Sequence, residues 1–104
     1  MDRTDAVFGA LSDPTRRALL ETIASRPDAT ATELAAELPI TRQAVLKHLS
    51  ALADAGLVDR ERSGREVHYR VTPAPLSDAV SWMADVGGQW DERLARLRNA
   101  VDPS

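Results

Sequence analysis

The chain of 104 residues contains no cysteine, which excludes disulfide bonds, thiolate metal sites and cysteine-based redox sensing. It also lacks any apolar run approaching the ~20 residues that a transmembrane helix needs. The start of the chain, Met1 to Asp5, lacks the basic and then apolar regions of a signal peptide. We therefore expect a cytoplasmic protein, which is associated with the nucleoid if it binds DNA.

The residues that enzymes use for catalysis are also scarce. The only histidines are His48 and His68, and no nucleophile is arranged around either of them. The sequence has no glycine-rich loop that could hold a phosphate. We therefore expect no enzymatic activity, no cofactor and no metal site.

The net charge of −3 argues against nucleic-acid binding, but the charge is unevenly distributed. Between Arg42 and Arg70 there are six basic and four acidic side chains, an excess of two positive charges. The rest of the chain therefore carries a net charge of −5. Only one of the thirteen basic residues is a lysine, so phosphate contacts would be made mainly by the planar guanidinium group of arginine.

The first half of a helix-turn-helix pattern begins at Thr30, within residues 30–56. Thr30 and Glu33 form a capping box, in which the hydroxyl accepts from one amide and the carboxylate accepts from the other. Leu34 and Leu38 then follow at helical spacing, and a proline ends the segment. We expect a short helix with one apolar edge.

The second helix of the pair is capped by Thr41. Val45, Leu49 and Leu52 recur at helical spacing, and Gly56 supplies the exit. Two short helices joined by a tight turn are typical of a helix-turn-helix, whose second helix enters the major groove of DNA.

Residues 57–72 predict a β-hairpin behind this second helix, with strands at 57–62 and 65–71 around a turn at Ser63 and Gly64. Alternation places four residues toward the core: Val58, Val67, Tyr69 and Val71. A hairpin in this position is the wing of a winged helix, and its arginines suit the DNA backbone or the minor groove.

Two helices precede this region, at about residues 4–11 and 14–25. The second has a polar residue and then a proline at its start, which favours helix initiation. Arg16 and Arg17 lie near the beginning of this helix, where the helix dipole disfavours cations. Either a structural ion pair or a contact with DNA would account for them.

Residues 75–101 carry an apolar residue at every third or fourth position, which is a heptad pattern. The seam consists of Leu76, Val80, Met83, Gly87, Trp90, Leu94, Leu97 and Val101. A helix of this length spans about 39 Å, longer than a small domain needs for its own core. The seam therefore predicts contact with the same helix of a second subunit. A break at Gly87 and Gly88, giving two shorter helices, is the alternative.

Together these elements predict a single domain over residues 1–104, mainly α with a small β-hairpin. The predicted order is four helices, two strands and a long last helix. This is a winged helix-turn-helix, with the helix-turn-helix at 30–56, the β-wing at 57–72 and the dimerisation helix at 75–101.

Four stretches carry a resemblance to a known family, and they occur in its order. They are residues 10–20 (ALSDPTRRALL), 41–49 (TRQAVLKHL), 53–58 (ADAGLV) and 65–70 (REVHYR). With them the chain resembles the ArsR-type (ArsR/SmtB) family of small bacterial winged-helix repressors. The resemblance implies a homodimer with a helical interface, which binds an imperfect palindrome in a promoter and usually represses its own operon.

The metal-sensing sites of that family do not carry over to this chain. The cysteines that some members use are absent, and the last helix has no histidine to join its acidic residues. The acidic residues are Asp78, Asp85, Asp91 and Glu92. The chain therefore resembles the metal-independent branch of the family, and the sequence does not identify a small-molecule inducer.

The candidate base-reading residues lie opposite the apolar seam of the second helix. Arg42, Gln43, Leu46, Lys47 and Ser50 point outward there. Arg42 suits the acceptors of guanine and Gln43 those of adenine. Leu46 would either contact a thymine methyl group or fill a gap between helices.

Phosphate contacts are expected from neighbouring residues of the same helix and from the wing. Thr41 is a helix cap and a phosphate ligand, and Lys47 and His48 also suit phosphate. For His48 the alternative is packing between helices with a hydrogen bond to the backbone. Arg62 and Arg65 flank the wing tip and suit the DNA backbone or the minor groove.

Some residues near these sites have two interpretations. Arg60 and Arg70 would either join the DNA contacts or pair with acids of the hairpin. The acidic candidates are Asp59, Glu61 and Glu66. Trp82 and Trp90 are expected in the core or the dimer interface, and a small apolar ligand pocket near them is the alternative.

The function predicted from the sequence is that of a homodimeric, sequence-specific DNA-binding transcriptional regulator. We expect a repressor that binds a palindromic promoter operator, often its own. The alternative, motivated by the net negative charge, is a winged-helix module that binds another protein and not DNA.

Overall fold

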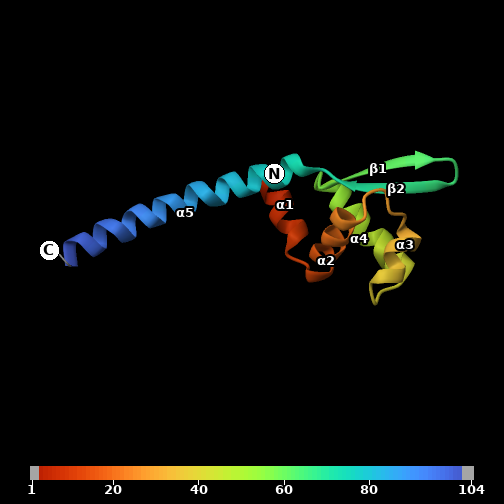
Figure 1. Cartoon of the computed structure of the whole chain (residues 1–104), viewed down its shortest axis with the longest axis horizontal. Helices are drawn as coiled ribbons and strands as arrows, with labels where there is room; N and C mark the ends of the chain where they lie inside the picture. The colour runs from red at the N-terminus through yellow and green to blue at the C-terminus, as the bar shows by residue number, and fades with distance from the viewer. Residues whose placement is uncertain (1–2, 102–104) are drawn as a thin grey trace.

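The computed structural model describes residues 3–101, apart from the side chains of Arg3, Leu94, Leu97, Arg98, Ala100 and Val101. Within these residues the helices and the hairpin follow the predicted order (Figure 1). The elements are α1 (Arg3–Leu11), α2 (Pro14–Ser25), α3 (Ala31–Glu37), α4 (Arg42–Asp54), β1 (Val58–Ser63), β2 (Glu66–Val71) and α5 (Pro73–Val101). The fold class predicted from the sequence is confirmed.

The molecule is elongated, with extents of 68 × 26 × 23 Å, because α5 extends away from the other elements (Figure 1). α5 is one helix of 29 residues, which corresponds to about 44 Å. It begins at Pro73, two residues earlier than predicted, because proline suits the first turn of a helix. It runs unbroken through Gly87 and Gly88, so the prediction of a single long helix is confirmed.

Polar caps begin the helices at the predicted places. The Asp13 carboxylate accepts from the amide of Thr15 at 2.8 Å, at the start of α2. The Thr30 hydroxyl accepts from the amide of Glu33, whose carboxylate accepts from the Thr30 amide, both at 3.2 Å. The Thr41 hydroxyl accepts from the amide three residues later at 3.1 Å. These bonds satisfy amides that have no partner inside their helices.

The apolar core lies between α1, α2, α3, α4 and the base of the hairpin. The inner face of α4 contributes Val45, Leu49 and Leu52, which are at most 1% exposed. They pack in one cluster with residues from the other elements, among them Val7, Leu19, Ile23, Leu34, Leu57 and Tyr69. Burying this face fixes the rotation of α4 and turns its opposite face to solvent.

Two glycines with left-handed backbone shape the wing. Gly56, with φ of +77°, turns the chain out of α4, and Gly64 has φ of +63°. In the register of the hairpin Ser63 pairs with Glu66, so the turn residues are Gly64 and Arg65, one position later than predicted. A glycine at the first central position suits a type II′ turn, and Arg65 therefore belongs to the tip.

The loop before α3 pairs with β2 of the hairpin through a single β-bridge. Ala29 forms an isolated bridge with Tyr69, whose amide donates to the Ala29 carbonyl at 3.0 Å. The Asp28 amide donates to the Tyr69 carbonyl at 3.1 Å. Four apolar side chains of the hairpin are buried or half-buried, as predicted: Val58, Val67, Tyr69 and Val71.

Replacing Leu49 with alanine should test the packing that orients α4. Leu49 is 1% exposed, and removing such a side chain lowers the free energy of unfolding by about 2–5 kcal/mol. Urea unfolding followed by circular dichroism measures the change. Ser50→Ala on the exposed side is the matched control and should change it by less than about 0.5 kcal/mol. Equal effects of the two substitutions would contradict this packing.

Candidate nucleic-acid interface

The exposed face of α4 carries the side chains predicted to read bases. Arg42, Gln43, Lys47 and Ser50 are exposed, opposite the buried seam. Leu46 is 36% exposed and is not enclosed between helices. An apolar side chain among polar neighbours on an open helix face suits contact with an apolar group such as a thymine methyl.

Arg42 is held against α3. Its Nε donates to the Thr32 hydroxyl oxygen at 3.1 Å, so the side chain crosses the turn between the two helices. Because this bond uses Nε, the two terminal nitrogens of the guanidinium group can still donate to a base or a phosphate. Thr32 was not among the residues predicted to belong to this interface, because nothing in the local sequence pattern connects it to Arg42.

A hollow of about 440 Å³ lies between α4 and the wing. Its walls come from the start of α3, the outer face of α4 and the turn and second strand of the hairpin. The lining residues are Thr30, Ala31, Thr32, Glu33, Arg42, Leu46, Arg65, Glu66, Val67 and Tyr69. Three of the predicted DNA-binding residues, Arg42, Leu46 and Arg65, thus meet around one surface.

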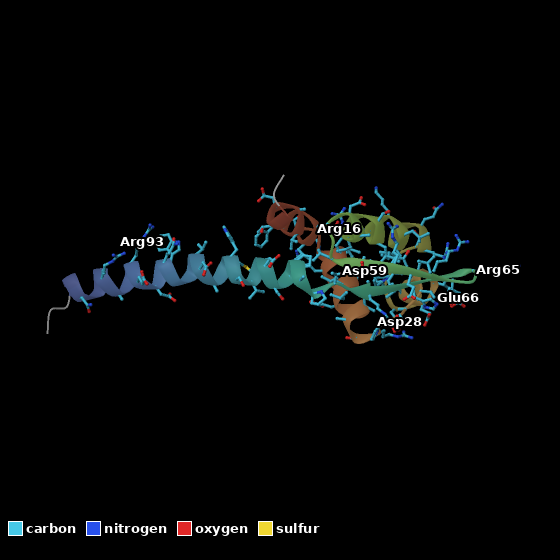
Figure 2. The ribbon with its side chains drawn as sticks, turned by 90° about the horizontal axis from the view of Figure 1, so that it is seen from above. Arg16, Asp28, Asp59, Arg65, Glu66 and Arg93 are labelled. Carbon is cyan, nitrogen blue, oxygen red and sulfur yellow. The ribbon has the colours of Figure 1, made fainter. Side chains whose placement is uncertain are left out.

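The wing places two arginines at its outer end. Arg65 lies at the tip of the hairpin (Figure 2) and lines the hollow. Arg62 is also exposed, and its Nε donates to the Gly64 carbonyl at 3.3 Å. In the hairpin register Arg62 lies opposite Val67, which lines the hollow. Arg62 and Arg65 were predicted to flank a turn at Ser63 and Gly64; in the structure Arg65 is itself a turn residue, and Arg62 lies on β1 just before the turn.

Arg70 binds a residue that the sequence did not suggest. Asp59 lies opposite Arg70 in the register, but the guanidinium group binds Asp28, in the loop before α3. Nε lies 2.5 Å from Oδ1 and Nη2 lies 3.1 Å from Oδ2. This bond lowers the pKa of the Asp28 carboxyl group and raises that of Arg70. The predicted pairing of Arg70 with an acid of the hairpin is corrected accordingly.

His68 lies between the same loop and the wing tip. Its Nδ1 is 2.6 Å from the Asp28 carbonyl oxygen, and its Nε2 is 3.2 Å from a carboxylate oxygen of Glu66. The hydrogen bond to the Asp28 carbonyl, and then the charges of Glu66, Asp28 and Glu33, raise the pKa of His68 above 6.5. Both ring nitrogens have acceptors, which favours the protonated imidazolium.

His48 is tied to α2. The side chain is half-buried, and its Nδ1 accepts from the Arg16 Nε at 3.3 Å. Its hydrogen-bond partner is therefore an arginine side chain in place of the predicted backbone group. Arg17 donates from Nη1 to the Leu11 carbonyl at 2.6 Å. Both arginines at the start of α2 thus have partners within the molecule, although neither forms an ion pair with a described side chain.

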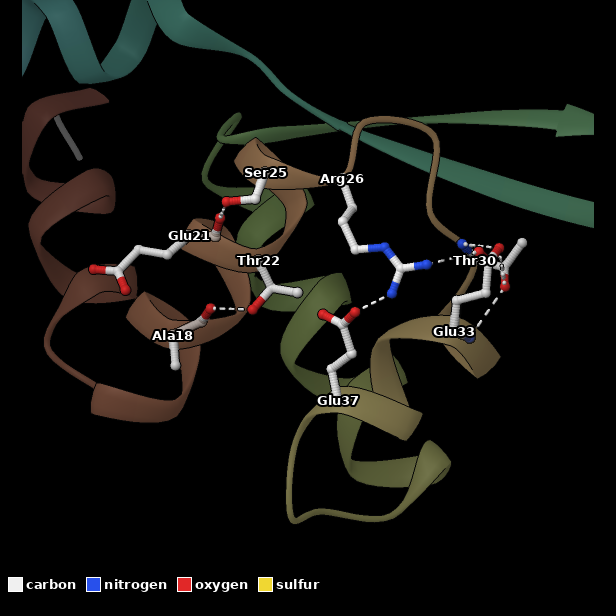
Figure 3. Close-up of polar contacts among 8 residues, drawn as sticks. All are labelled: Ala18, Glu21, Thr22, Ser25, Arg26, Thr30, Glu33 and Glu37. Carbon is white, nitrogen blue, oxygen red and sulfur yellow. Dashed lines mark hydrogen bonds and ion pairs between the residues drawn. The ribbon is translucent and has the colours of Figure 1, made fainter.

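Arg26 links the loop before α3 to α3 itself (Figure 3). Its guanidinium group forms an ion pair with Glu37, and Nη2 lies 3.6 Å from a carboxylate oxygen of Glu33. The Thr30 amide, together with its hydroxyl and then the charge of Arg26, lowers the pKa of the Glu33 carboxyl group. The loop is therefore fastened on one side to α3 and on the other to the wing.

α5 exposes an apolar stripe beside its contact with α1. Phe8 of α1 meets the Trp82 ring edge-on, with the ring centroids 5.6 Å apart. Val80, Met83 and Trp90 are 59%, 47% and 56% exposed. Side chains of this size are rarely left open in such a row unless a partner covers them.

The remaining members of the predicted seam divide into two groups. Leu76 and Gly87 are half-buried, whereas the side chains of Leu94, Leu97 and Val101 lie outside the described part of the structure. Arg93 places its guanidinium carbon 5.7 Å from the centre of the Trp90 ring, a distance at which a cation is attracted to the ring face.

Two further properties concern residues 3–101. Among them, no group of three or more histidine, cysteine, aspartate or glutamate side chains is placed to hold a metal ion. Within the same range, no helix combines the length and the apolar character needed to cross a membrane.

α4, the second helix of the helix-turn-helix, has one exposed face, and the hairpin that follows it carries arginines. These two elements lie around one hollow. They define the class of DNA-binding proteins with a winged helix-turn-helix. Comparison with known proteins agrees with this class. A family model described as a helix-turn-helix domain matches residues 11–61. The HTH-type transcriptional regulator YuzN of Bacillus subtilis is 48% identical over 73 residues, covering 64% of this chain and 76% of the relative.

Two further relatives match over most of the chain. The transcriptional repressor SdpR of B. subtilis is 32% identical, covering 85% of this chain and 97% of SdpR. A solved ArsR-like transcriptional regulator from Rhodococcus sp. RHA1 superposes with a TM-score of 0.82, at 41% identity over 94% of this chain and 92% of that one. The chain belongs to the ArsR-type family of winged helix-turn-helix transcriptional regulators. It is a DNA-binding regulator and not an enzyme.

The raised pKa of His68 predicts a pH dependence of stability. A raised pKa in the folded state stabilises the fold below the unfolded value of 6.5, and this contribution is lost as pH rises through the folded pKa. Urea unfolding between about pH 6 and about pH 8 should therefore show a larger loss of stability for the wild type than for His68→Gln. An NMR titration of His68 with a pKa at or below 6.5 would contradict this interpretation.

Proposed function

We propose that the protein is a homodimeric, sequence-specific regulator that represses transcription from a palindromic promoter operator, its own included. The observation that carries the proposal is the meeting of α4 residues and a wing arginine around one hollow. An α-helix fits the major groove, and a hairpin tip can reach the adjacent minor groove. Such a regulator would work at the nucleoid, in the cytoplasm.

The outer face of α4 reads the bases in this proposal. Arg42 pairs with the acceptors of guanine, Gln43 with those of adenine, and Leu46 contacts a thymine methyl group. Thr41 and Lys47, at the start of α4 and on its outer face, bind phosphates on either side of the groove. The contact of Arg42 with Thr32 at 3.1 Å supports this role, because it orders a long side chain before DNA arrives.

The wing contributes contacts to the adjacent backbone or minor groove. Arg62 and Arg65 are exposed on either side of Gly64, and arginine suits the negative potential of a narrow minor groove. His48 links α4 to α2 through its hydrogen bond with Arg16. Because this bond uses Nδ1, a phosphate contact by His48 would use Nε2.

The charge distribution orients the protein on DNA. The segment from Arg42 to Arg70 carries an excess of two positive charges, whereas the remainder carries −5. The acidic remainder is repelled by phosphates and the reading face is attracted to them. The overall negative charge is therefore compatible with DNA binding at this one face.

A second copy of the chain covers the stripe on α5. The open side chains Val80, Met83 and Trp90 lie along one side of a helix that extends far beyond its own core. The proposed interface comprises Leu76, Val80, Met83, Gly87, Trp90, Leu94 and Leu97. A two-fold dimer presents two copies of the reading head, which comprises α1 to α4 and the wing. The operator should therefore be an inverted repeat with matching symmetry.

Replacing Arg42 or Arg62 with alanine should weaken operator binding. Loss of a bidentate base contact costs about tenfold or more in affinity, and loss of a phosphate or minor-groove contact costs less but flattens the salt dependence. Fluorescence anisotropy with a promoter fragment across a salt series measures both effects. Arg96→Ala on α5, which removes the same charge far from the reading head, is the matched control.

The same experiment separates DNA binding from the protein-interaction alternative. If neither Arg42→Ala nor Arg62→Ala reduces retention of the chain's own promoter at low salt, the assigned reading face is wrong. A wild type that shows no binding at low salt would favour the alternative, in which the wing and α4 bind another protein.

A charged residue in the α5 stripe should dissociate the dimer without unfolding the head. Met83 is 47% exposed in the single chain, so Met83→Asp leaves the fold intact but places a carboxylate in the proposed apolar seam. Sedimentation at micromolar concentration should show a dimer for the wild type and a monomer for Met83→Asp. Ser81→Asp, outside the seam, should remain dimeric. A folded wild-type monomer would contradict the interface.

A further inference from the structure

We infer that Asp28 is a positioning residue for DNA binding, which holds the wing at the angle that presents Arg62 and Arg65 to the DNA. This inference rests on the proposed function, because the wing arginines matter only if the protein binds DNA. Asp28 itself lies in the loop before α3, away from the wing tip (Figure 2).

The backbone of the loop is built to meet the wing at this residue. Asp28 has φ of +69°, the only non-glycine residue with positive φ in the described part of the chain. Aspartate tolerates this left-handed conformation better than most residues. The turn directs the Asp28 amide to the Tyr69 carbonyl, and the next residue accepts from the Tyr69 amide.

Side chains complete the attachment on both sides of Tyr69. Arg70 binds both carboxylate oxygens of Asp28, at 2.5 and 3.1 Å. His68 bonds the Asp28 carbonyl at 2.6 Å and also contacts Glu66, nearer the tip. Asp28 therefore holds three consecutive residues of β2 through four hydrogen bonds, two of them charge-assisted.

The outer part of the wing has little else to set its direction. Residues 59–66 are all exposed, so the hairpin packs against the core only at its base. A six-residue strand spans about 20 Å, so a swing of about ten degrees at the base displaces the tip by about 3 Å. That displacement is enough to break a hydrogen bond between a tip arginine and DNA.

The same loop also fixes the other reading element. Arg26 ties it to Glu33 and Glu37 of α3, and Thr32 of α3 holds Arg42 of α4. The loop is thus bonded to the wing directly and is connected through α3 to the start of α4. Asp28 is the residue of this loop whose side chain bonds to the wing.

The Asp28–Arg70 pair is solvent-exposed, with 47% and 58% of the side chains accessible. Such pairs contribute little to global stability, so Asp28→Asn should fold normally, and asparagine also tolerates positive φ. The thermal midpoint should remain within a few degrees of the wild type. Loss of the pair should therefore change the global stability little. It should instead change the orientation of the wing.

The first test compares Asp28→Asn with Asp59→Asn in operator binding. Removing a negative charge should by itself tighten DNA binding. Asp59 lies opposite Arg70 on β1, so its substitution makes the same charge change nearby. We expect Asp28→Asn to bind about threefold to tenfold more weakly, with a shallower salt dependence because wing contacts are lost, while Asp59→Asn binds as well as the wild type or better.

A double-substitution cycle separates positioning from direct contact by Arg70. If Arg70 acts through Asp28, then Arg70→Gln should weaken binding in the wild type and add little in the Asp28→Asn background. Additive effects would assign Arg70 a contact of its own and overturn the positioning role. Asp28→Asn binding as tightly as Asp59→Asn would overturn it as well.

The second test needs no DNA, so it stands apart from the proposed function. The chain has no cysteine, and spin labels can therefore be placed at Ser63→Cys on the wing and Ser50→Cys on α4, with labelled subunits diluted by unlabelled ones. The distance distribution between the labels should be narrow in the wild type and in Asp59→Asn and broader in Asp28→Asn. An unchanged distribution in Asp28→Asn would refute the inference. Absence of operator binding by the wild type would refute the proposed function, and with it the role of Asp28 in DNA binding, but would leave the orientation of the wing by Asp28 standing.

Discussion

The burial of one face of α4 is the constraint on which the rest of the molecule depends. Val45, Leu49 and Leu52 are almost completely buried, so α4 has a single rotation in which its apolar side is satisfied. That rotation exposes Arg42, Gln43 and the other polar residues together. The proposed reading face, the outer side of α4, is therefore a consequence of core packing, and no separate device is needed to form it.

The other elements take their positions from this core. α3 meets α4 at a tight turn and holds Arg42, and the hairpin leaves α4 through Gly56 and is buried only at its base. The loop before α3 joins the wing to α3 through Asp28 and Arg26. α5 then carries an apolar stripe away from the head, which couples DNA reading to pairing of subunits in the proposed function.

Local features were predictable from the sequence because they depend on neighbouring residues. The capping box of Thr30 and Glu33 and the spacing of Val45, Leu49 and Leu52 are examples. The bond between Asp28 and Arg70 was not predictable, since it joins side chains 42 positions apart and depends on how the loop packs against the hairpin. The turn was misplaced by one residue because Gly64 can occupy either central position of a hairpin turn.

Selection of bound sequences from a random DNA pool examines at once the proposed base reading by α4 and the proposed pairing of two subunits. A symmetric pair of reading faces should enrich an inverted repeat whose half-site centres lie about one helical turn, or a multiple of it, apart. Arg42→Ala should relax the preference at one symmetric pair of positions in that repeat. Recovery of a single half-site would contradict the pairing of two subunits on DNA, and recovery of no enriched sequence at all would contradict base reading by α4.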